Sequence, residues 1–250
     1  MTRTKKQTPI FISGDRSLVE EFVRSSRTDI FEFHGFVNGG AKEGRLPDEV
    51  RRARTPSRRT HIAIELSSHP ASKKKNLKQI EPRLTPNSVI LSSSVNIALS
   101  SQSAWLTRPE RVVGIGAFPT LLSGKLIEVA SGRLTSKEPV RAARDFFLQN
   151  GKEISVVQDR VGMVMPRILC MIVNEAAFAL TEQVATAGDI DTAMKLGTNY
   201  PDGPIAWGDR IGFSCVTDLL EAIYHDLQED RYRIAPLLRQ LSSGSRWWKS

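Results

Sequence analysis

The feature that most constrains the fold is an alternation of short apolar runs with amphipathic segments over the first 159 residues. Residues 9–15 (PIFISGD) and 28–36 (TDIFEFHGF) combine β-branched and aromatic residues and predict two strands. Between them, residues 16–26 place their apolar side chains on one side, which predicts an amphipathic helix. Parallel strands need a crossover connection of this kind, so the unit predicts a parallel pair.

The alternation continues as far as Asp159 and favours an α/β fold, with an open, mostly parallel sheet and helices between its strands. Residues 38–60 interrupt it, because they are rich in Gly, Pro and charged residues and predict a loop around a short polar helix. The other segments are predicted as strands at 60–66, 88–95, 111–118, 124–131 and 152–159, and as helices at 73–84, 96–106 and 136–151.

After Asp159 the pattern becomes helical. Residues 161–185 predict a long helix that is apolar on nearly every side, and such a helix lies in a core or at an interface. Further helices are predicted within 187–201, 203–228 and 233–244. The sequence therefore divides into an α/β domain at 1–159 and an all-helical domain at 160–250.

The net charge of +8 is concentrated in the first third of the chain. Basic clusters occur at 51–59 (RRARTPSRR) and 73–75 (KKK), while the remaining two thirds of the chain are balanced. A solvated basic surface is the first interpretation, and a phosphate-bearing ligand such as a coenzyme A thioester is the second. Nucleic-acid binding is a weaker alternative, because neither interleaved aromatic residues nor a recognisable motif accompanies the charge.

The two cysteines, Cys170 and Cys215, make no disulfide framework and lack the spacing of a metal site, which favours a reducing compartment, the cytoplasm. The N-terminus is basic but lacks an apolar segment of signal-peptide length. The longest apolar stretch is interrupted by Pro166 and Arg167, among others, so it predicts a buried helix rather than a membrane span.

Several phrases of the sequence, in this order, resemble phrases of the 3-hydroxyacyl-CoA dehydrogenase family. They are RPERVVGIGAF (108–118), GKLIEVASGRLTS (124–136), NGKEISVVQDRVGMVMPRILCMIVNEAAFALTE (150–182), DIDTAMKLGTNYPDGPIAWGDRIG (189–212) and RYRIAPLLRQL (231–241). The resemblance is strong over 105–240, weaker over 60–104 and only topological before that.

The resemblance implies a Rossmann-like NAD-binding domain, here reduced and shortened at its N-terminus, followed by a helical domain through which the protein forms a homodimer. In the family, a histidine takes the hydroxyl proton of a 3-hydroxyacyl-CoA as NAD is reduced, in fatty acid metabolism. A glutamate orients that histidine, and a serine and an asparagine hold the substrate oxygen and the histidine. This is general base catalysis with an orienting carboxylate.

Matching the family's phrases to this sequence shows which of these groups are kept. The orienting glutamate falls on Glu128, in KLIEV. The histidine position is occupied by Gly116, so the base is missing, and the asparagine position by Pro166, which suits the first turn of a helix. The resemblance therefore implies that Glu128 once oriented a histidine that this chain lacks.

The serine that holds the substrate oxygen in the family falls near Val95. Ser93, Ser94 and Asn96 are its neighbours, and a small shift would let one of them supply a polar group. These three residues are therefore weak candidates for the site.

The family's first turn carries a G-x-G-x-x-G phrase, whose glycines let the backbone approach a pyrophosphate at a helix N-terminus. The corresponding turn here is SGDRSL, with Gly14 alone and with Asp15 and Arg16 where small residues are needed. Gly14, Lys74 and Lys75 are weak candidates for cofactor binding. NAD is implied only by the resemblance, and the sequence offers no metal site.

His61 and His69 are the candidates for a replacement base, because they flank a strand predicted to end at the mouth of the sheet. Three hypotheses follow. The first is a pseudoenzyme that keeps the framework and binds an acyl-CoA or a paralogous subunit. The second is an active dehydrogenase with a rearranged site, and the third is nucleic-acid binding through the basic first third. The first is preferred, because several parts of one mechanism are altered together.

Overall fold

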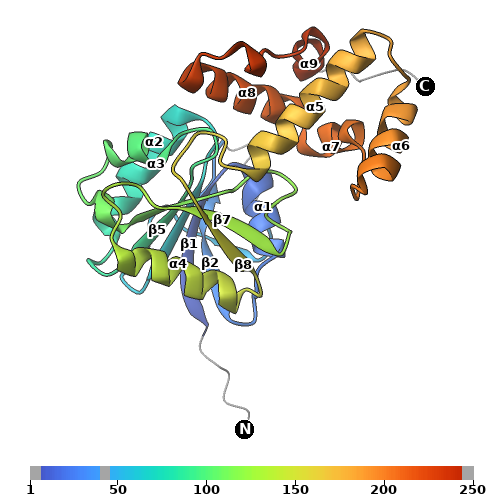
Figure 1. Cartoon of the computed structure of the whole chain (residues 1–250). Helices are drawn as coiled ribbons and strands as arrows, with labels where there is room; N and C mark the ends of the chain where they lie inside the picture. Colours follow the sequence, from blue (N-terminus) through green and yellow to red (C-terminus); the bar gives the residue numbers. More distant parts are fainter. Residues whose placement is uncertain (1–6, 40–45, 244–250) are drawn as a thin grey trace. The chain divides into compact units, whose positions relative to one another are not determined.

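The computed structural model describes residues 7–39 and 46–243. It divides into two compact units, Met1–Met163 and Val164–Ser250 (Figure 1). The division falls after Met163, whereas the sequence predicts it after Asp159. Within the described ranges no helix is both long enough and apolar enough to cross a membrane.

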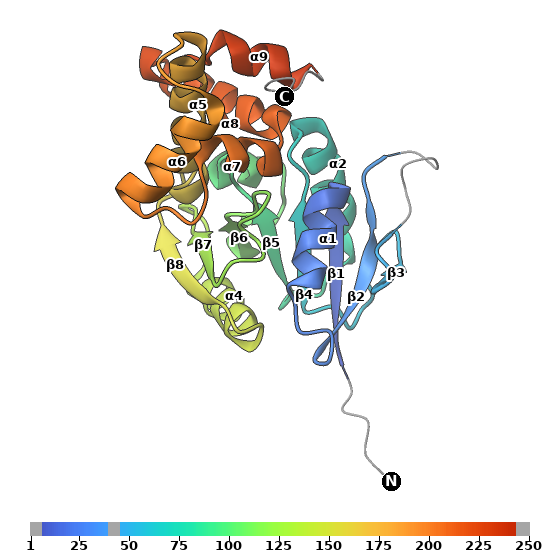
Figure 2. The same ribbon diagram turned by 90° about the vertical axis from the view of Figure 1, so that its right-hand side faces the viewer.

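The described part of the first unit contains one eight-stranded sheet in the order β3-β2-β1-β4-β5-β6-β7-β8, which Figure 2 shows along its width. All neighbouring strands are parallel except β6 and β7, which are antiparallel. The strands are β1 (Thr8–Gly14), β2 (Phe31–Val37), β3 (Val50–Arg52), β4 (Ile62–Leu66), β5 (Val89–Ser93), β6 (Val112–Ile115), β7 (Leu126–Ala130) and β8 (Glu153–Val157). The predicted fold class, an open and mostly parallel Rossmann-like sheet, is confirmed.

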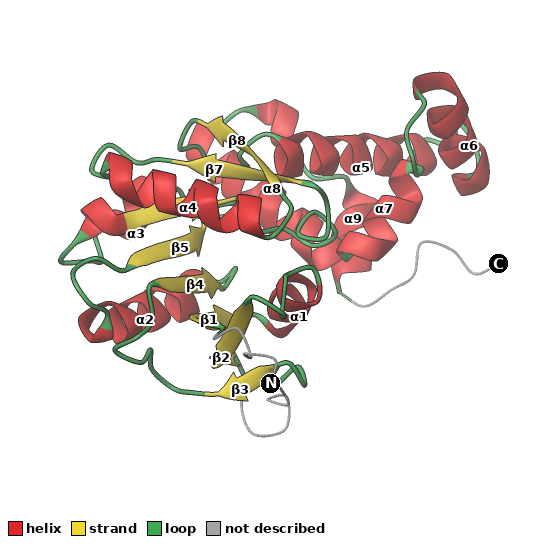
Figure 3. Ribbon diagram, turned by 90° about the horizontal axis from the view of Figure 1, so that it is seen from below, coloured by secondary structure: helices red, strands yellow, loops and turns green. Residues whose placement is uncertain are grey.

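Helices cover both faces of the sheet (Figure 3). In β1, Ile10 and Ile12 face a core closed by α1 and α4, whereas Phe11 faces a second core closed by α2 and α3. This is the period of two expected for a strand buried on both faces. The helices are α1 (Arg16–Arg24), α2 (Pro70–Ile80), α3 (Leu99–Ser103) and α4 (Lys137–Gln149).

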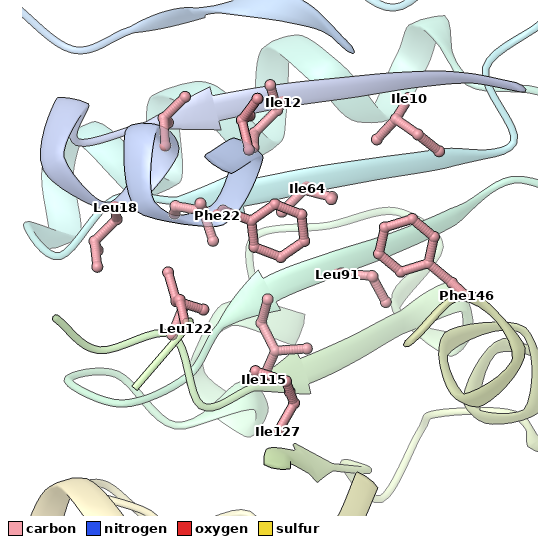
Figure 4. Close-up of a cluster of buried hydrophobic side chains, with 14 of the residues drawn as sticks. Ile10, Ile12, Leu18, Phe22, Ile64, Leu91, Ile115, Leu122, Ile127 and Phe146 are labelled. Carbon is pink, nitrogen blue, oxygen red and sulfur yellow. The ribbon is translucent and has the colours of Figure 1, made fainter. Parts of the chain in front are cut away.

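The larger core joins the two halves of the sheet. Phe22 of α1 stacks on Phe146 of α4, with ring centroids 6.3 Å apart and nearly parallel planes. The close-up in Figure 4 shows these rings among Ile64, Leu91 and Ile115 from three strands. Burial of aromatic and aliphatic side chains is the main stabilising contribution in such a core, at about 1.5–3 kcal/mol for each large side chain.

One prediction about the first unit is wrong. A short polar helix was expected within 38–60, but residues 46–60 contain β3 instead, parallel to β2. Residues 40–45 lie outside the described ranges. β3 has three residues, two of them arginines, so it lacks the apolar alternation that identifies a longer strand.

The described part of the second unit is entirely helical. Its central helix carries Asn174, whose side-chain amide donates to the Arg233 carbonyl and accepts from the Ala235 N–H. These two hydrogen bonds join the central helix to the residues that precede the last helix. One helix was expected within 203–228, but Gly212 at φ 89° separates two. The helices are α5 (Met165–Thr181), α6 (Ala187–Thr198), α7 (Pro204–Ile211), α8 (Phe213–Leu227) and α9 (Pro236–Ser242).

Candidate functional site

Glu128 lies in the middle of β7, opposite the end of β6, and is only 6% exposed. The antiparallel pairing of β6 with β7 aligns Gly116 with it, and the Gly116 N–H donates to the Glu128 carbonyl oxygen at 2.8 Å. A Cβ atom on Gly116 would lie 3.1 Å from the Glu128 Cβ. A side chain at position 116 would therefore lie against the Glu128 carboxylate, but a glycine offers no group that takes a proton.

The hydroxyls of Ser93, the last residue of β5, and of Ser94, the residue after it, are both buried and turned into the protein. The Ser93 Oγ donates to the Ala117 carbonyl oxygen at 3.2 Å, and the Ser94 Oγ lies 3.8 Å from the Met163 sulfur. A thioether is a weak acceptor, so Met163 gives this end of the sheet an apolar character. Ser94 and Glu128 thus both lie near the ends of β5 and β6, and the position beside them that the resemblance assigns to the histidine holds Gly116.

Val95 takes the position that the resemblance assigns to the substrate-holding serine. It is fully buried, and its carbonyl oxygen accepts the Gly162 N–H at 2.7 Å. Asn96, the next residue, is half-buried in the loop after β5. Of the weak candidates, Asn96 is thus the one that presents a partly exposed polar side chain.

Neither histidine candidate approaches Glu128. His61 precedes β4 and so lies at the amino edge of the parallel strands, which corrects its predicted place at the mouth. His69 follows β4 and caps α2, where its Nδ1 accepts the Ala71 N–H at 3.3 Å. β4 is three strands from β7, a separation of roughly 14 Å at the usual strand spacing.

The side chain of Asp15 closes the turn after β1. Asp15 accepts the Ser68 N–H at 2.7 Å and the Asn38 side-chain amide at 2.8 Å. Gly14 packs so closely that a Cβ there would lie 2.5 Å from the Leu66 carbonyl carbon. Asp15 is the N-cap residue of α1 but makes no side-chain hydrogen bond to that helix. A carboxylate therefore lies where a dinucleotide would place its pyrophosphate.

A buried ion pair lies beside this turn. Lys73 of α2 is 1% exposed and Glu65 of β4 is 0% exposed, and the Lys73 Nζ lies 2.5 Å from the Glu65 Oε2. The other Glu65 oxygen accepts from the Ser67 N–H at 3.0 Å, from the Ser67 hydroxyl and from the Asn76 amide at 3.1 Å. Both charges are thus paired and hydrogen-bonded, which burial of charges requires.

Asn38 connects the two groups, because its amide oxygen accepts from Asn76 at 3.0 Å and its amide nitrogen donates to Asp15. Asp15, Asn38, Glu65, Lys73 and Asn76 form one polar network at the carboxyl ends of β1, β2 and β4, which we call the cradle network. NAD does not fit this arrangement, because the network places a carboxylate at the α1 N-terminus and leaves no glycine-lined approach.

The three consecutive lysines point in different directions. Lys73 is buried against Glu65, Lys74 lies 5.9 Å from the centre of the Trp105 ring, and Lys75 lines a surface pocket. Successive helical residues are about 100° apart, which explains the divergence. Of the candidates for phosphate binding, Lys75 thus lies at a cavity, whereas Lys74 packs on an aromatic ring.

Sequence reasoning missed Glu65 as a structural group. The signal was present, since Glu65 lies in the apolar run HIAIEL as Glu128 lies in KLIEV, and a carboxylate in such a run needs partners. Asn38 and Asn76 carry no comparable signal, because isolated asparagines in a loop and a helix are common.

The remaining candidate residues, Pro166 and Cys170, lie in the second unit. Pro166 is buried in the first turn of α5, the position expected for a proline. Burial raises the pKa of the Cys170 thiol above its ordinary value, so this cysteine is not a nucleophile at neutral pH. The described residues contain no group of three or more His, Cys, Asp and Glu side chains able to hold a metal ion.

Two family models match the chain. The model described as "3-hydroxyacyl-CoA dehydrogenase, NAD binding domain" matches residues 58–160, and "3-hydroxyacyl-CoA dehydrogenase, C-terminal domain" matches residues 162–247. The NAD-binding-domain match begins in the loop that precedes β4, so β1, β2 and β3 lie outside both family models.

Curated relatives match part of their own length. A 3-hydroxyadipyl-CoA dehydrogenase of Escherichia coli is 42% identical over 119 residues, 48% of this chain and 25% of the relative. A probable 3-hydroxybutyryl-CoA dehydrogenase of Bacillus subtilis is 32% identical over 180 residues, 72% of this chain and 63% of the relative. The aligned regions thus span less than two thirds of either relative.

Solved structures match over nearly the whole chain. The (S)-3-hydroxybutyryl-CoA dehydrogenase PaaH1 of Ralstonia eutropha is 25% identical with a TM-score of 0.77, over 95% of this chain and 94% of the other. FadB2 of M. tuberculosis is 18% identical with a TM-score of 0.81, over 98% of this chain and 100% of the other. The second similarity is one of fold alone.

Proposed function

Because the chain belongs to the 3-hydroxyacyl-CoA dehydrogenase family, we propose that it keeps the framework of this family but does not turn over 3-hydroxyacyl-CoA with NAD. In its place it binds an acyl-CoA or serves as a subunit scaffold. This is the role of a pseudoenzyme, in which the fold is retained and the chemistry is not.

The observation that carries the proposal is the glycine opposite Glu128. A hydride transfer from a hydroxyl carbon requires that the hydroxyl lose its proton, and a general base contributes about 10²–10⁴-fold to such a step. The position that would aim a base at Glu128 holds Gly116, and the adjacent Met163 sulfur cannot take the proton at neutral pH. The glutamate is therefore kept, whereas the position of the histidine that the family's glutamate orients holds a glycine.

The cradle network supports the proposal independently. A bound dinucleotide would have to displace Asp15 from the Ser68 N–H and from Asn38, at the cost of buried hydrogen bonds. Substituting the base alone would therefore restore little activity.

A scaffold role needs a surface on which a second subunit can bind. In the second unit Val184 is 70% exposed, Leu196 is 82% exposed and α6 has no buried residue. Large exposed apolar side chains grouped on one segment are typical of protein interfaces. We propose that the surface formed by α6 and by Val184 just before it joins two copies of the chain, or one copy to a paralogous subunit, in the cytoplasm.

The test is an assay of NADH formation from NAD and 3-hydroxybutyryl-CoA with the purified chain. We expect turnover below about 10⁻² s⁻¹, against roughly 10 s⁻¹ for an ordinary enzyme. The control is the Glu128→Gln variant, which should leave any residual rate unchanged, because no base depends on its orientation. Turnover at the ordinary rate that is abolished by Glu128→Gln would refute the proposal.

The Gly116→His variant separates the two defects. Its imidazole would lie against Glu128, since the Cβ position is 3.1 Å from the Glu128 Cβ. We expect less than about tenfold recovery of NAD-dependent turnover, because the turn after β1 still excludes the pyrophosphate. Recovery of 10²-fold or more, the scale of a general base, would show that the cradle network opens to admit NAD.

A further inference from the structure

A pocket of about 470 Å³ lies at the carboxyl end of β2, between the end of β3 and α2. Phe36, near the end of β2, and Asn38, just after this strand, form one wall of the pocket. Arg52 at the end of β3, Arg54 two residues later and Lys75 of α2 also line it. Ligands of open parallel sheets bind outside the carboxyl ends of the strands, so the pocket occupies a usual place for a ligand.

The pocket is strongly cationic. Two chain segments contribute Arg52, Arg54 and Lys75, and none of the described residues that line it is an aspartate or a glutamate. Arg54 and Lys75 are exposed at its rim. The like charges of Arg54 and Lys75 repel each other, and a bound anion relieves that repulsion.

The polar floor of the pocket is already committed to the protein. The Asn38 and Asn76 amides donate inward, to Asp15 and Glu65 of the cradle network. The exposed Arg54 and Lys75 and the half-buried Phe36 of the wall are available for recognition of a ligand. An aromatic wall beside guanidinium groups suits a flat base with an attached anion.

We propose that this pocket binds the ribose phosphomonoester of an adenosine nucleotide, as carried by the 3′-phosphate of coenzyme A. A phosphomonoester has about −1.5 to −2 charges at pH 7 and three acceptor oxygens, which match several cations better than the single charge of a diester. The residue directly after β2 is Asn38 rather than the acidic residue that would hold a free ribose hydroxyl, and its amide is turned towards Asp15.

This inference names the group by which an acyl-CoA is held, and it rests on the acyl-CoA-binding part of the proposed function. The two can fail separately. The NADH assay tests the loss of turnover, whereas nucleotide fragments test the pocket with neither an acyl chain nor NAD present.

The experiment is a calorimetric titration of the whole chain with adenosine 3′,5′-bisphosphate, adenosine 2′,5′-bisphosphate and adenosine 5′-monophosphate. We expect the 3′,5′-bisphosphate to bind at least tenfold more tightly than the monophosphate and to weaken as salt is added. A preference for the 2′,5′-bisphosphate would keep the phosphomonoester but overturn its assignment to coenzyme A. Equal affinity for all three nucleotides, or no binding, would overturn the site itself.

Variants locate the binding. Lys75→Glu and Arg54→Ala should each weaken the 3′,5′-bisphosphate at least tenfold. The matched controls are Lys74→Glu, on the same helix but against Trp105, and Arg58→Ala, which lines a different pocket. Both controls should change the affinity less than threefold. An equal loss in variants and controls would assign the effect to the overall charge of the chain and overturn the pocket.

Discussion

Two buried glutamates of one sheet show how differently the two halves of the candidate site are built. Glu65 on β4 is held by Lys73, Ser67 and Asn76, whereas Glu128 on β7 lies against the bare backbone of Gly116. Glu65 lies near the end of β4 and Glu128 lies opposite the end of β6, at the edge of the sheet where a ligand would bind. The first half is a closed polar network, whereas in the second half a glycine lies beside the glutamate.

On the proposed function, the difference teaches that loss of activity leaves different marks where a cofactor binds and where a proton moves. A pyrophosphate cradle left empty would expose backbone donors, so other polar groups close it. A missing base leaves only a smaller side chain, which a neighbouring apolar group such as Met163 covers. The cradle is therefore expected to contribute more to stability than the Glu128 end, and this expectation can be measured.

The largest effect is expected for Lys73→Met. It leaves the Glu65 charge buried without its partner, and breaking a buried pair in this way costs about 3–5 kcal/mol in the free energy of unfolding. The measurement is urea denaturation followed by circular dichroism. Lys74→Met is the control and should cost less than about 1 kcal/mol, the scale of an exposed cation–π contact. Equal stability of the two variants would contradict the expectation that the cradle network contributes strongly to the free energy of unfolding.

The next effect is expected for Gly14→Ala. Its Cβ would lie 2.5 Å from the Leu66 carbonyl carbon, and Gly14 has φ 140°, so we expect a loss of about 2–3 kcal/mol. The matched variant is Gly116→Ala, whose Cβ would meet the Glu128 Cβ at 3.1 Å and a sulfur at 3.5 Å. It should cost about 1 kcal/mol or less, because side chains can give way more easily than a strand backbone. A reversed order would show that the Glu128 end is the tighter of the two.

The smallest effect is expected for Glu128→Gln. The substitution keeps the shape and most hydrogen bonds of the side chain and removes a charge, so we expect a change of about 1 kcal/mol or less in the free energy of unfolding. Glu65→Gln, made in parallel, removes the partner of Lys73 and should cost at least about 2 kcal/mol more. Thermal and urea denaturation of both variants would sharpen the comparison, and similar losses would contradict it.

Much of the fold follows from the sequence. The strand–helix alternation up to Asp159 and the helical remainder were predictable, because each element carries the periodicity of its own type. β3 was not, because a three-residue edge strand containing Arg51 and Arg52 has no apolar pattern. The split at Gly212 was missed because a single glycine within an apolar helical pattern is often tolerated.

The site was predictable in part. The alignment of family phrases placed Gly116, and the structure puts it beside Glu128, which spacing along one strand alone could not establish. The orientation of three identical lysines was not predictable, since composition cannot tell which of them meets Glu65. The family is established by the comparisons, whereas the loss of activity is a proposal that rests on particular side chains.

The shortness of β3 has a consequence for the behaviour of the protein in solution. The strand ends the sheet, and the outer edge of any sheet can pair with a strand of another molecule and start aggregation. Three residues offer few free backbone groups, and charged side chains on an edge strand, here those of Arg51 and Arg52, disfavour pairing with another strand. We expect this basic fringe to keep concentrated protein soluble, and polyanions that neutralise it to promote precipitation.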